Sequence, residues 1–274
     1  MNSAARIAYC PPGSGSRMIV RYPFLFWLAF ASLSPVTLAQ GLWLRLRAPR
    51  MPALLGNAEK GQLGNASAKP TARLLVVGES TAMGVGCETG AQSVGLQLAE
   101  RIAARDALSL EWQTIGGNGL RARQLVSMLA VRSPQPRDEA SIALVLLGVN
   151  DAVGLSSRKH WQDQLVLIRS RLRERGVSRI YLAPVPPMGQ FTLLPRPLRW
   201  VLGWRARMLE SARLDIAAHF NDVKALHTDF PDRQDLLASD GYHPGPGACA
   251  LWADELVAQV ESLTSPGRAT REDR

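Results

Sequence analysis

The sequence predicts an α/β protein in which helices cover both faces of a parallel sheet of about five strands. Several short apolar runs, rich in Val, Ile and Leu, do not alternate with polar residues, which is typical of strands buried on both faces. Longer segments with apolar residues at helical spacing lie between these runs. Strand and helix therefore alternate along the chain, as they do in a doubly wound sheet.

The predicted strands are three strongly apolar runs and two weaker ones. They cover residues 73–77, 142–147 and 179–183, and, more weakly, 110–115 and 223–226. Amphipathic helices are predicted over residues 93–105, 120–131, 161–175, 198–220 and 248–263. In doubly wound sheets ligands bind outside the carboxyl ends of the strands, so polar residues directly after these runs are the candidates for function.

An almost uncharged segment, residues 22–44, precedes this domain. It is long enough to cross a bilayer, and Trp27 and Trp43 lie towards its ends as interfacial aromatics do. Three interpretations are open: an uncleaved membrane anchor, a cleaved signal peptide, or a buried core helix. Pro35 and Gln40 interrupt an ideal span, but the basic residues after the segment resist export and favour the anchor.

The charge distribution supports a membrane or targeting role for the N-terminal part. Residues 1–73 contain nine Lys and Arg but one Glu, so almost all of the formal net charge of +9 lies there. The rest is nearly neutral and has no basic stripe with interleaved aromatics, which argues against nucleic-acid binding. We expect a basic segment 1–21, an anchor or signal segment 22–44, a linker 45–72, a globular α/β domain 73–263 and a disordered tail 264–274.

Three cysteines are spread along the chain. Cys10, Cys87 and Cys249 are odd in number and have no metal-ligand spacing. We therefore expect three free thiols, with Cys87 and Cys249 buried as small apolar residues. Neither a metal site nor any other cofactor is indicated, and nothing in the sequence bears on the oligomeric state.

Ser80 comes directly after the first predicted strand and is the candidate nucleophile. Its own backbone N–H, at the start of the next element, can donate to an oxyanion. A serine in this place alone would more often be a helix cap or a turn residue. The assignment therefore depends on which residues stand at the ends of the other strands.

Two further strand ends carry hydrogen-bond donors. Gly116-Gly117-Asn118-Gly119 comes after the second strand, and glycine lets a backbone N–H approach a substrate closely. Asn150 comes after a third strand, and its side-chain amide can donate to the same oxyanion. Taken singly, each is also an ordinary turn, and Asp151 is expected to have a structural turn or cap role.

Asp240 and His243 are three residues apart before Pro244. One tight loop can carry both, with His243 as general base and Asp240 as the group that orients it. The pair could equally be a polar loop if it stood alone. His160 and His227 lack a comparable context and are expected at the surface or at helix caps.

Taken together, the four motifs resemble those of the SGNH hydrolases, also called the GDSL esterase/lipase family, over residues 72–263. Gly78-Glu79-Ser80, Gly119, Gly148-Val149-Asn150-Asp151 and Asp240-Gly241-Tyr242-His243 correspond to its four blocks, with Gly117 as the alternative in the second. The resemblance implies a triad of Ser80, His243 and Asp240, and an oxyanion hole from the N–H groups of Ser80 and Gly119 with the Asn150 amide. It also implies a flavodoxin-like three-layer α/β/α sandwich.

One position departs from this pattern, and one other family remains a candidate. Glu79 replaces the family's aspartate, which keeps the charge, adds a methylene and would require the loop contacts to rearrange. The segment Gly78-Glu79-Ser80-Thr81-Ala82 nearly matches the Gly-x-Ser-x-Gly turn of α/β-hydrolases. Ser80, however, ends the first strand of the domain, which leaves no earlier strands for that fold.

The resulting hypothesis is a carboxylic-ester hydrolase, anchored in a membrane or located in the cell envelope, in a periplasmic or other extracytoplasmic setting. The substrate would be a small-molecule, lipid or acylated-glycan ester. A Pro-rich apolar segment, residues 184–200, is expected either to contact an acyl chain or the membrane, or to pack on the domain edge. The alternatives are acyl transfer by the same triad and a non-catalytic tethered module.

Overall fold

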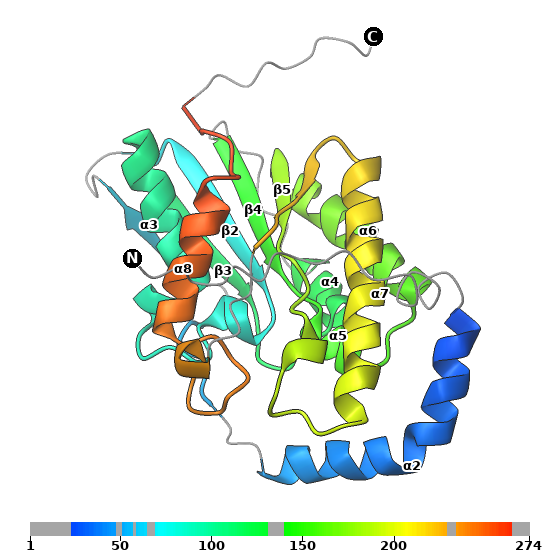
Figure 1. Ribbon diagram of the computed structural model, residues 1–274. Helices are drawn as coiled ribbons and strands as arrows, with labels where there is room; N and C mark the ends of the chain where they lie inside the picture. Colours follow the sequence, from blue (N-terminus) through cyan, green and yellow to red (C-terminus); the bar gives the residue numbers. More distant parts are fainter. Residues whose placement is uncertain are drawn as a thin grey trace, which may run out of the picture.

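The computed structural model describes residues 23–47, 51–56, 59–64, 69–130, 140–228 and 234–264 (Figure 1). The expected basic segment 1–21, Cys10 and nearly all of the expected tail (265–274) lie outside the described residues.

Six strands form one sheet in the order β1–β3–β2–β4–β5–β6. The strands are β1 (Lys60–Leu63), β2 (Ala72–Gly78), β3 (Leu110–Gly116), β4 (Ala140–Leu146), β5 (Arg179–Leu182) and β6 (Val223–Ala225). Strands β2 to β6 are parallel, and β1 pairs antiparallel with β3 at one edge. Without β1 this is the flavodoxin-like order, in which the chain reverses direction across the sheet between β2 and β4. The predicted α/β class and parallel sheet are confirmed, with six strands instead of about five.

The edge strand β1 corrects the expectation of a linker over residues 45–72. Its sequence, Lys-Gly-Gln-Leu, is short, polar and glycine-containing, so it has no apolar run that would predict a strand. It forms because Leu110–Gly116 offers an unpaired edge, to which β1 adds. Leu55, in the same stretch, is buried against the domain, and its N–H donates to the carbonyl of Met83.

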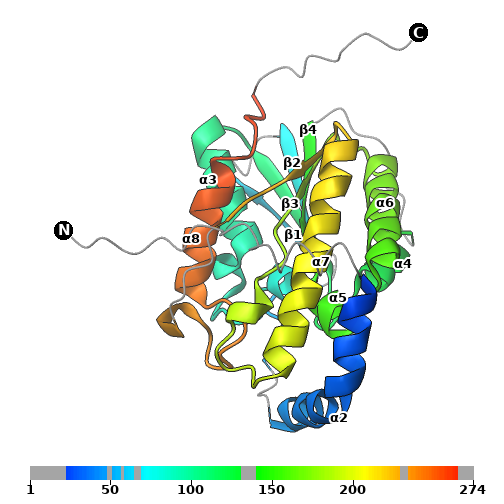
Figure 2. The same cartoon turned by 45° about the vertical axis from the view of Figure 1, so that its right-hand side comes forward.

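Helices cover both faces of the sheet (Figures 1 and 2). On one face lie α3 (Val94–Asp106) and α8 (Pro246–Val257), and on the other α4 (Ala122–Ala130), α6 (Arg158–Glu174) and α7 (Leu198–His219). Alternate residues of β2 serve the two layers: Leu74 and Val76 pack in the core under α3 and α8, whereas Leu75 and Val77 pack under α4, α6 and α7. Burial of each such side chain stabilises the fold by roughly 1.5–3 kcal/mol.

Short elements complete the connections. They are the helix α5 (Val149–Val153) and the 3₁₀ turns η1 (Ser80–Met83), η2 (Gly90–Gln92), η3 (Met188–Gln190) and η4 (Gln234–Leu236). The turn η1 comes after β2 and the helix α5 after β4, so both lie at the carboxyl ends of the parallel strands.

The N-terminal segment forms one helix, α2 (Pro23–Arg47), which contains Pro35 and is sharply bent in Figures 1 and 2. Proline bends helices because it lacks the N–H for one backbone hydrogen bond. The helix contacts α7, where Thr37 is buried and Leu44 packs against the main core. Within the described part of the chain, no helix combines the length and hydropathy needed to cross a membrane.

Candidate active site

Ser80 is the first residue of η1, directly after β2. The turn is tight because Gly78 and Gly116 leave no side chains between the strand ends: a Cβ at Gly78 would lie 2.1 Å from the carbonyl oxygen of Leu146. The N–H of Glu79 donates to that same carbonyl at 2.9 Å. The carboxyl ends of β2 and β4 are therefore drawn together, and Ser80 is held at the point where the strand order reverses.

Asp240 and His243 lie in a closed loop just before α8. The loop is fixed by hydrogen bonds from the N–H of Ala238 to the carbonyl of His243, and from the N–H of Gly245 to the carbonyl of Leu236. Gly241, with φ of 71°, makes a left-handed turn that other residues adopt at a cost. The Asp240 Oδ1 accepts the N–H groups of Tyr242 and His243 at 2.9 and 3.0 Å, so the carboxylate also organises its own loop.

The structure joins Ser80, His243 and Asp240 in one hydrogen-bonded chain. The His243 Nε2 lies 2.9 Å from the Ser80 Oγ, and its Nδ1 lies 2.5 Å from the Asp240 Oδ2. Because the carboxylate can only accept, the proton of the neutral ring sits on Nδ1, which leaves Nε2 to accept the Ser80 hydroxyl. The three predicted residues thus have the geometry in which a serine is activated by a neighbouring base.

The Asp240 carboxyl is suited to stay ionised beside this base. Burial by itself raises the pKa of Asp240, but the hydrogen bonds from the His243 ring and from two backbone N–H groups outweigh it and hold the pKa below its usual value. Its side chain is 4% exposed, whereas that of His243 is 27% exposed. An ionised, buried Asp240 is therefore placed to stabilise a positive charge on the His243 ring.

Glu79 holds the turn that carries Asn150. Its Oε1 accepts the Val149 N–H at 2.9 Å, and its Oε2 accepts both the backbone N–H and the side-chain Nδ2 of Asn150, at 3.0 and 2.6 Å. One of the two Nδ2 hydrogens is thereby used to fix the amide, and the other remains for a ligand. The Glu79 side chain, one methylene longer than an aspartate, reaches from the end of β2 to the end of β4. This contact could not be predicted from the sequence.

Burial makes the Glu79 carboxyl unusual. Desolvation raises its pKa to about 7, against the opposing effect of the hydrogen bonds from the backbone N–H groups of Asn150 and Val149. The residue is only 4% exposed. Near neutral pH the carboxyl that holds the Asn150 amide by a hydrogen bond consequently changes charge.

Two backbone N–H groups complete the candidate oxyanion hole. Those of Ser80 and Gly119 make no hydrogen bond to another residue in the described part of the chain. The Gly117 N–H, in contrast, donates to the carbonyl of Gly78 at 3.2 Å, so it is already used. Gly119 has φ of 76° and open space around its Cα, whereas the Asn118 amide points to the carbonyl of Met51. This geometry favours Gly119 over Gly117 as the donor.

Asp151 has a structural role, as expected from its position. Its Oδ2 accepts the N–H of Ala122 at the start of α4, and its Oδ1 accepts the hydroxyl of Ser156 at 2.6 Å. The carboxylate thus ties α5 to α4 and steadies the turn that presents Asn150.

The segment between β5 and α7, residues 184–197, which we call the strap, lies beside the Asp240–His243 loop. A Cβ added to Gly241 would lie 2.0 Å from the Leu193 Cδ1, so Leu193 rests on the loop itself. Phe191 and Tyr242 both pack against the edge of the main core. The strap is held at its start by Glu210, which accepts the Val185 N–H. Its far end is held by α2, where Gln40 bonds to the carbonyl of Arg196.

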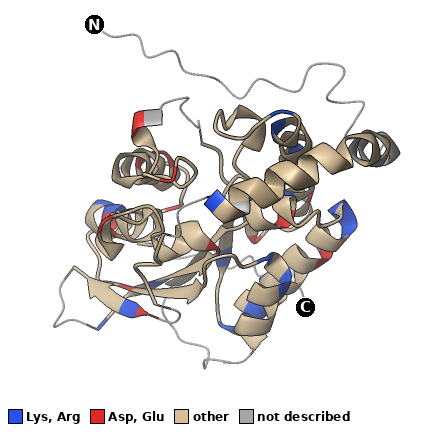
Figure 3. Cartoon of the chain, turned by 90° about the horizontal axis from the view of Figure 1, so that it is seen from below, with Lys and Arg blue, Asp and Glu red and all other residues tan. Residues whose placement is uncertain are grey.

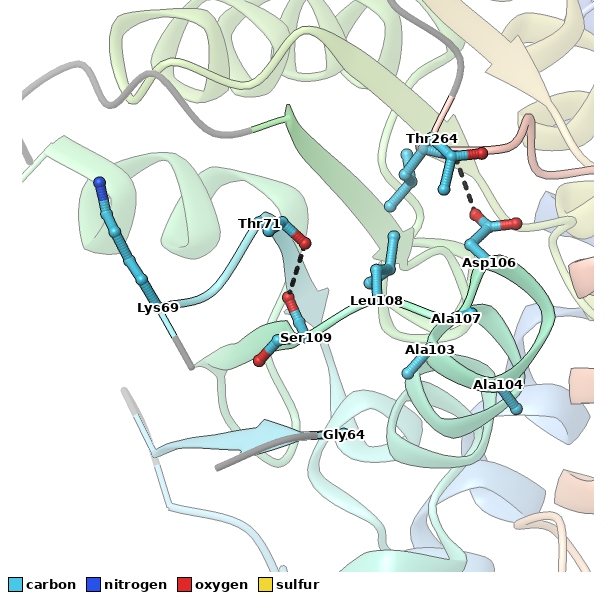
Figure 4. Close-up of a pocket in the computed structure, with 11 residues that line it drawn as sticks. Gly64, Lys69, Thr71, Ala103, Ala104, Asp106, Ala107, Leu108, Ser109 and Thr264 are labelled. Carbon is cyan, nitrogen blue, oxygen red and sulfur yellow. Dashed lines mark hydrogen bonds between the residues drawn. The ribbon is translucent and has the colours of Figure 1, made fainter. Parts of the chain in front are cut away.

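A cavity of about 730 Å³ lies at the opposite end of the sheet, near the amino ends of β2 and β3 (Figure 4). It is lined by Gly64, Lys69, Thr71, Ala103, Ala104, Asp106, Ala107, Leu108, Ser109, Leu263 and Thr264. The one carboxylate among the lining residues, that of Asp106, accepts hydrogen bonds from the Arg105 guanidinium and from the N–H of Leu263. No histidine is among these lining residues, so they lack the hydroxyl–imidazole pair that Ser80 and His243 form at the other end of the sheet.

Residues 76–250 match the model of the GDSL-like Lipase/Acylhydrolase family. The GDSL-like esterase Rv1075c of Mycobacterium tuberculosis is 28% identical over an alignment of 201 residues that covers 70% of this chain. The chain spans 62% of the length of that relative.

Two solved structures resemble the fold. TesA is 18% identical with a TM-score of 0.52, covering 70% of this chain and 99% of that chain. The lipase Lip_vut3 from a goat rumen metagenome is 12% identical with a TM-score of 0.52, covering 69% of this chain and 97% of that chain. At these identities the likeness concerns the fold alone.

The raised pKa of Glu79 leads to a testable pH dependence. Since the folded pKa lies above the ordinary value of 4.5, the stabilising contribution of the protonated carboxyl is complete below about pH 4.5. It is lost as the pH rises through about 7. We expect the free energy of unfolding of the wild type, relative to Glu79→Gln, to fall by about 3 kcal/mol between pH 4.5 and pH 8.

Urea unfolding of both proteins at pH 4.5, 6, 7 and 8 measures this difference. Glu100→Gln, on the exposed side of α3, is the control for removing a carboxyl from the chain. A wild-type to Glu79→Gln difference that stays constant across this range would contradict the shifted pKa.

Proposed function

Because the chain belongs to the GDSL-like lipase/acylhydrolase family, we propose that it is a serine esterase that cleaves carboxylic esters through an acyl-enzyme on Ser80. The single observation that carries this proposal is the chain of hydrogen bonds from the Ser80 Oγ through His243 to Asp240. The esterase activity named for the Mycobacterium tuberculosis relative supports it.

In the first half of the reaction, the Ser80 Oγ attacks the ester carbonyl carbon while its proton passes to the His243 Nε2. Asp240 stabilises the resulting imidazolium. The negative charge on the carbonyl oxygen is met by the N–H groups of Ser80 and Gly119 and by the free Nδ2 hydrogen of Asn150. Loss of one such donor in other hydrolases slows turnover by about 10²–10³-fold.

The tetrahedral intermediate then collapses. His243 returns its proton to the departing alcohol oxygen, the C–O bond breaks, and the acyl group stays on Ser80. A water molecule, deprotonated by the same Nε2, attacks the acyl carbon, and Ser80 leaves with the proton as the free acid is released. Glu79 touches no reacting atom in this scheme and acts as a positioning residue through Asn150.

Replacement of the nucleophile is the direct test. We expect Ser80→Ala to lower hydrolysis of p-nitrophenyl esters by the full chain roughly 10³–10⁶-fold, because the hydroxyl that faces His243 is removed. Ser127→Ala, an exposed serine on α4, is the matched control and should keep full activity. Labelling of the wild type by a fluorophosphonate probe, lost in Ser80→Ala, should accompany turnover.

Each other result changes the assignment in a defined way. A folded wild type that neither turns over esters nor takes the probe contradicts the proposal and favours a non-catalytic module. Labelling at Ser80 with the acyl group moved to an added alcohol in preference to water assigns an acyltransferase instead.

For the substrate, we propose an ester whose acyl chain lies along the strap. Leu193 is 49% exposed although it rests on the loop that carries the base. Phe191, two residues earlier on the strap, and Tyr242, next to Gly241, add partly buried apolar surface beside the main core. An acyl chain of several carbons would cover this surface, whereas an acetyl group would not reach it.

Chain-length selectivity tests this arrangement. We expect Leu193→Ser, alone and combined with Phe191→Ser, to lower kcat/KM for octanoyl esters at least about fivefold relative to acetyl esters. Leu251→Ser on α8 is the matched control, since Leu251 is similarly exposed (46%) but lies on another element. Equal losses on acetyl and octanoyl esters would contradict a role for the strap in holding the acyl chain.

For the setting, we propose that α2 holds the protein against a lipid surface in the cell envelope. Residues at spacings of three and four (Thr37, Gln40 and Leu44) face the domain, whereas Leu38, Leu42 and Leu46 are 66%, 59% and 76% exposed on the other side. Figure 3 looks on to this end of the molecule, and the sequence of α2 is uncharged from Pro23 to Leu44, with Arg45 and Arg47 in its last turn.

Aromatic and basic side chains support the same orientation. The Arg47 guanidinium lies 5.3 Å from the ring centre of Trp43, and that of Arg196 lies 5.6 Å from Trp200. Both tryptophans are about half exposed. Trp beside Arg suits the boundary between acyl chains and phosphate groups. Since Gln40 also bonds to the N–H of Leu198, α2 would bring the strap to the lipid that supplies the ester.

Binding to vesicles containing anionic phospholipid tests this setting. We expect the full chain to bind, and Leu38→Ser, Leu42→Ser and Leu46→Ser together to weaken binding at least about tenfold. Exposed apolar residues elsewhere, changed as Val166→Ser, Leu167→Ser and Leu251→Ser, provide the matched control. Undiminished binding of the α2 variant would contradict the surface role, and wild-type protein that resists alkaline extraction would assign a spanning anchor.

A further inference from the structure

Two of the three cysteines meet in the folded protein although 162 positions separate them. The Sγ atoms of Cys87 and Cys249 lie 3.6 Å apart, and both residues are free thiols. Cys249, in the first turn of α8, is 1% exposed, whereas Cys87 is half-buried. Two thiols in contact, one of them accessible, form a different chemical group from the three separate thiols that the sequence predicts.

The pair joins the two halves of the candidate active site. Cys87 belongs to the segment that continues from η1, in which the Val85 N–H donates to the carbonyl of Ser80. The neighbouring Gly86 lies so close to the base loop that a Cβ there would be 2.9 Å from the His243 Cβ. On the other side, the Cys249 N–H donates to the carbonyl of Gly245, two residues after His243.

We propose that Cys87 and Cys249 form a redox-active pair, which closes to a disulfide in the folded protein and ties the segment after Ser80 to the loop that carries His243. The proposal rests on the position of the two thiols and is independent of the ester chemistry.

The oxidant that the step requires is a low-molecular-weight disulfide of the glutathione type. The Cys87 thiolate attacks one sulfur of oxidised glutathione, which forms a mixed disulfide and releases one glutathione thiolate. The Cys249 sulfur, after loss of its proton, then attacks the Cys87 Sγ and expels the second glutathione. Two protein thiols are oxidised, and one glutathione disulfide is reduced to two thiols, which take up the two protons.

The surroundings of the two sulfurs assign these roles. The hydrogen bond with Cys249 lowers the pKa of the Cys87 thiol, and the same contact together with burial raises that of Cys249. Cys87 is therefore the attacking thiol, and the buried Cys249 resolves the mixed disulfide. Closing the bond brings the sulfurs from 3.6 Å to about 2.05 Å.

The expected consequence is a redox-dependent stability. A disulfide that closes so long a loop restricts the unfolded chain strongly, and it should raise the Tm of the full chain by roughly 5–15 °C. Because the bond spans the contact between the Ser80 segment and the His243 loop, the temperature at which ester turnover is lost should rise with it. In an oxidising compartment the closed form would persist, and in a reducing one the dithiol.

The experiment is oxidation of the purified full chain under native conditions with glutathione buffers of graded redox potential. We expect a Cys87–Cys249 linked peptide in a non-reducing digest, loss of two of the three free thiols, and the higher Tm. Cys249→Ala should stop at a mixed disulfide between Cys87 and glutathione, and Cys87→Ser should form neither product. Cys10→Ser should behave as the wild type.

Either of two results overturns the proposal. One is a folded wild type that stays reduced, or stops at the glutathione adduct, at potentials that fully oxidise a reference peptide disulfide. The other is a linked peptide without any change in Tm, which would show that the bond does not hold the two segments together. Because the digest reports on the wild type, the test does not depend on the folding of the variants.

Discussion

The close approach of three strand ends is the constraint on which the rest of the site depends. A Cβ at Gly116 would lie 2.1 Å from the carbonyl oxygen of Gly78, and one at Gly78 would lie as close to the carbonyl of Leu146. Only glycine lets β3, β2 and β4 converge in this way. The turns after these strands carry Gly119, Ser80 and Asn150, so the absence of two side chains brings these three turns together at one edge of the sheet.

Glu79 turns this convergence into a defined position for the Asn150 amide. A buried carboxylate is costly unless it is hydrogen-bonded, and here three N–H groups from a single turn compensate for the burial. The compensation is incomplete, because desolvation still raises the pKa to about 7. Aspartate, one methylene shorter, could reach the same groups only if the strand ends lay closer. The length of the glutamate side chain therefore fits the distance between the ends of β2 and β4.

Much of this arrangement could be predicted from the sequence, because strand ends in a parallel sheet meet at one edge. That rule brings Ser80, Gly119 and Asn150 together from their positions after apolar runs. It cannot place groups whose contacts depend on side-chain reach or on loop packing. Three contacts arise in this way: the hydrogen bonds of Glu79 to the turn after β4, the packing of Leu193 on Gly241, and the contact between Cys87 and Cys249. The edge strand β1 was missed for a different reason, since its polar residues take their conformation from β3.

The base loop differs from the other parts of the site because, among the described residues, no strand of the main sheet leads directly into it. Its position comes from its own hydrogen bonds, from Gly86 on one side and from Leu193 on the other. The 2.9 Å contact between His243 and Ser80 therefore depends on side-chain packing between segments far apart in sequence. Such packing opens more readily than a hydrogen-bonded sheet. A covalent link from Cys87 to Cys249 would act at this weaker contact and limit the movement of the base loop away from Ser80. Leu193 of the strap, which α2 holds in place, would steady the opposite side of the same loop.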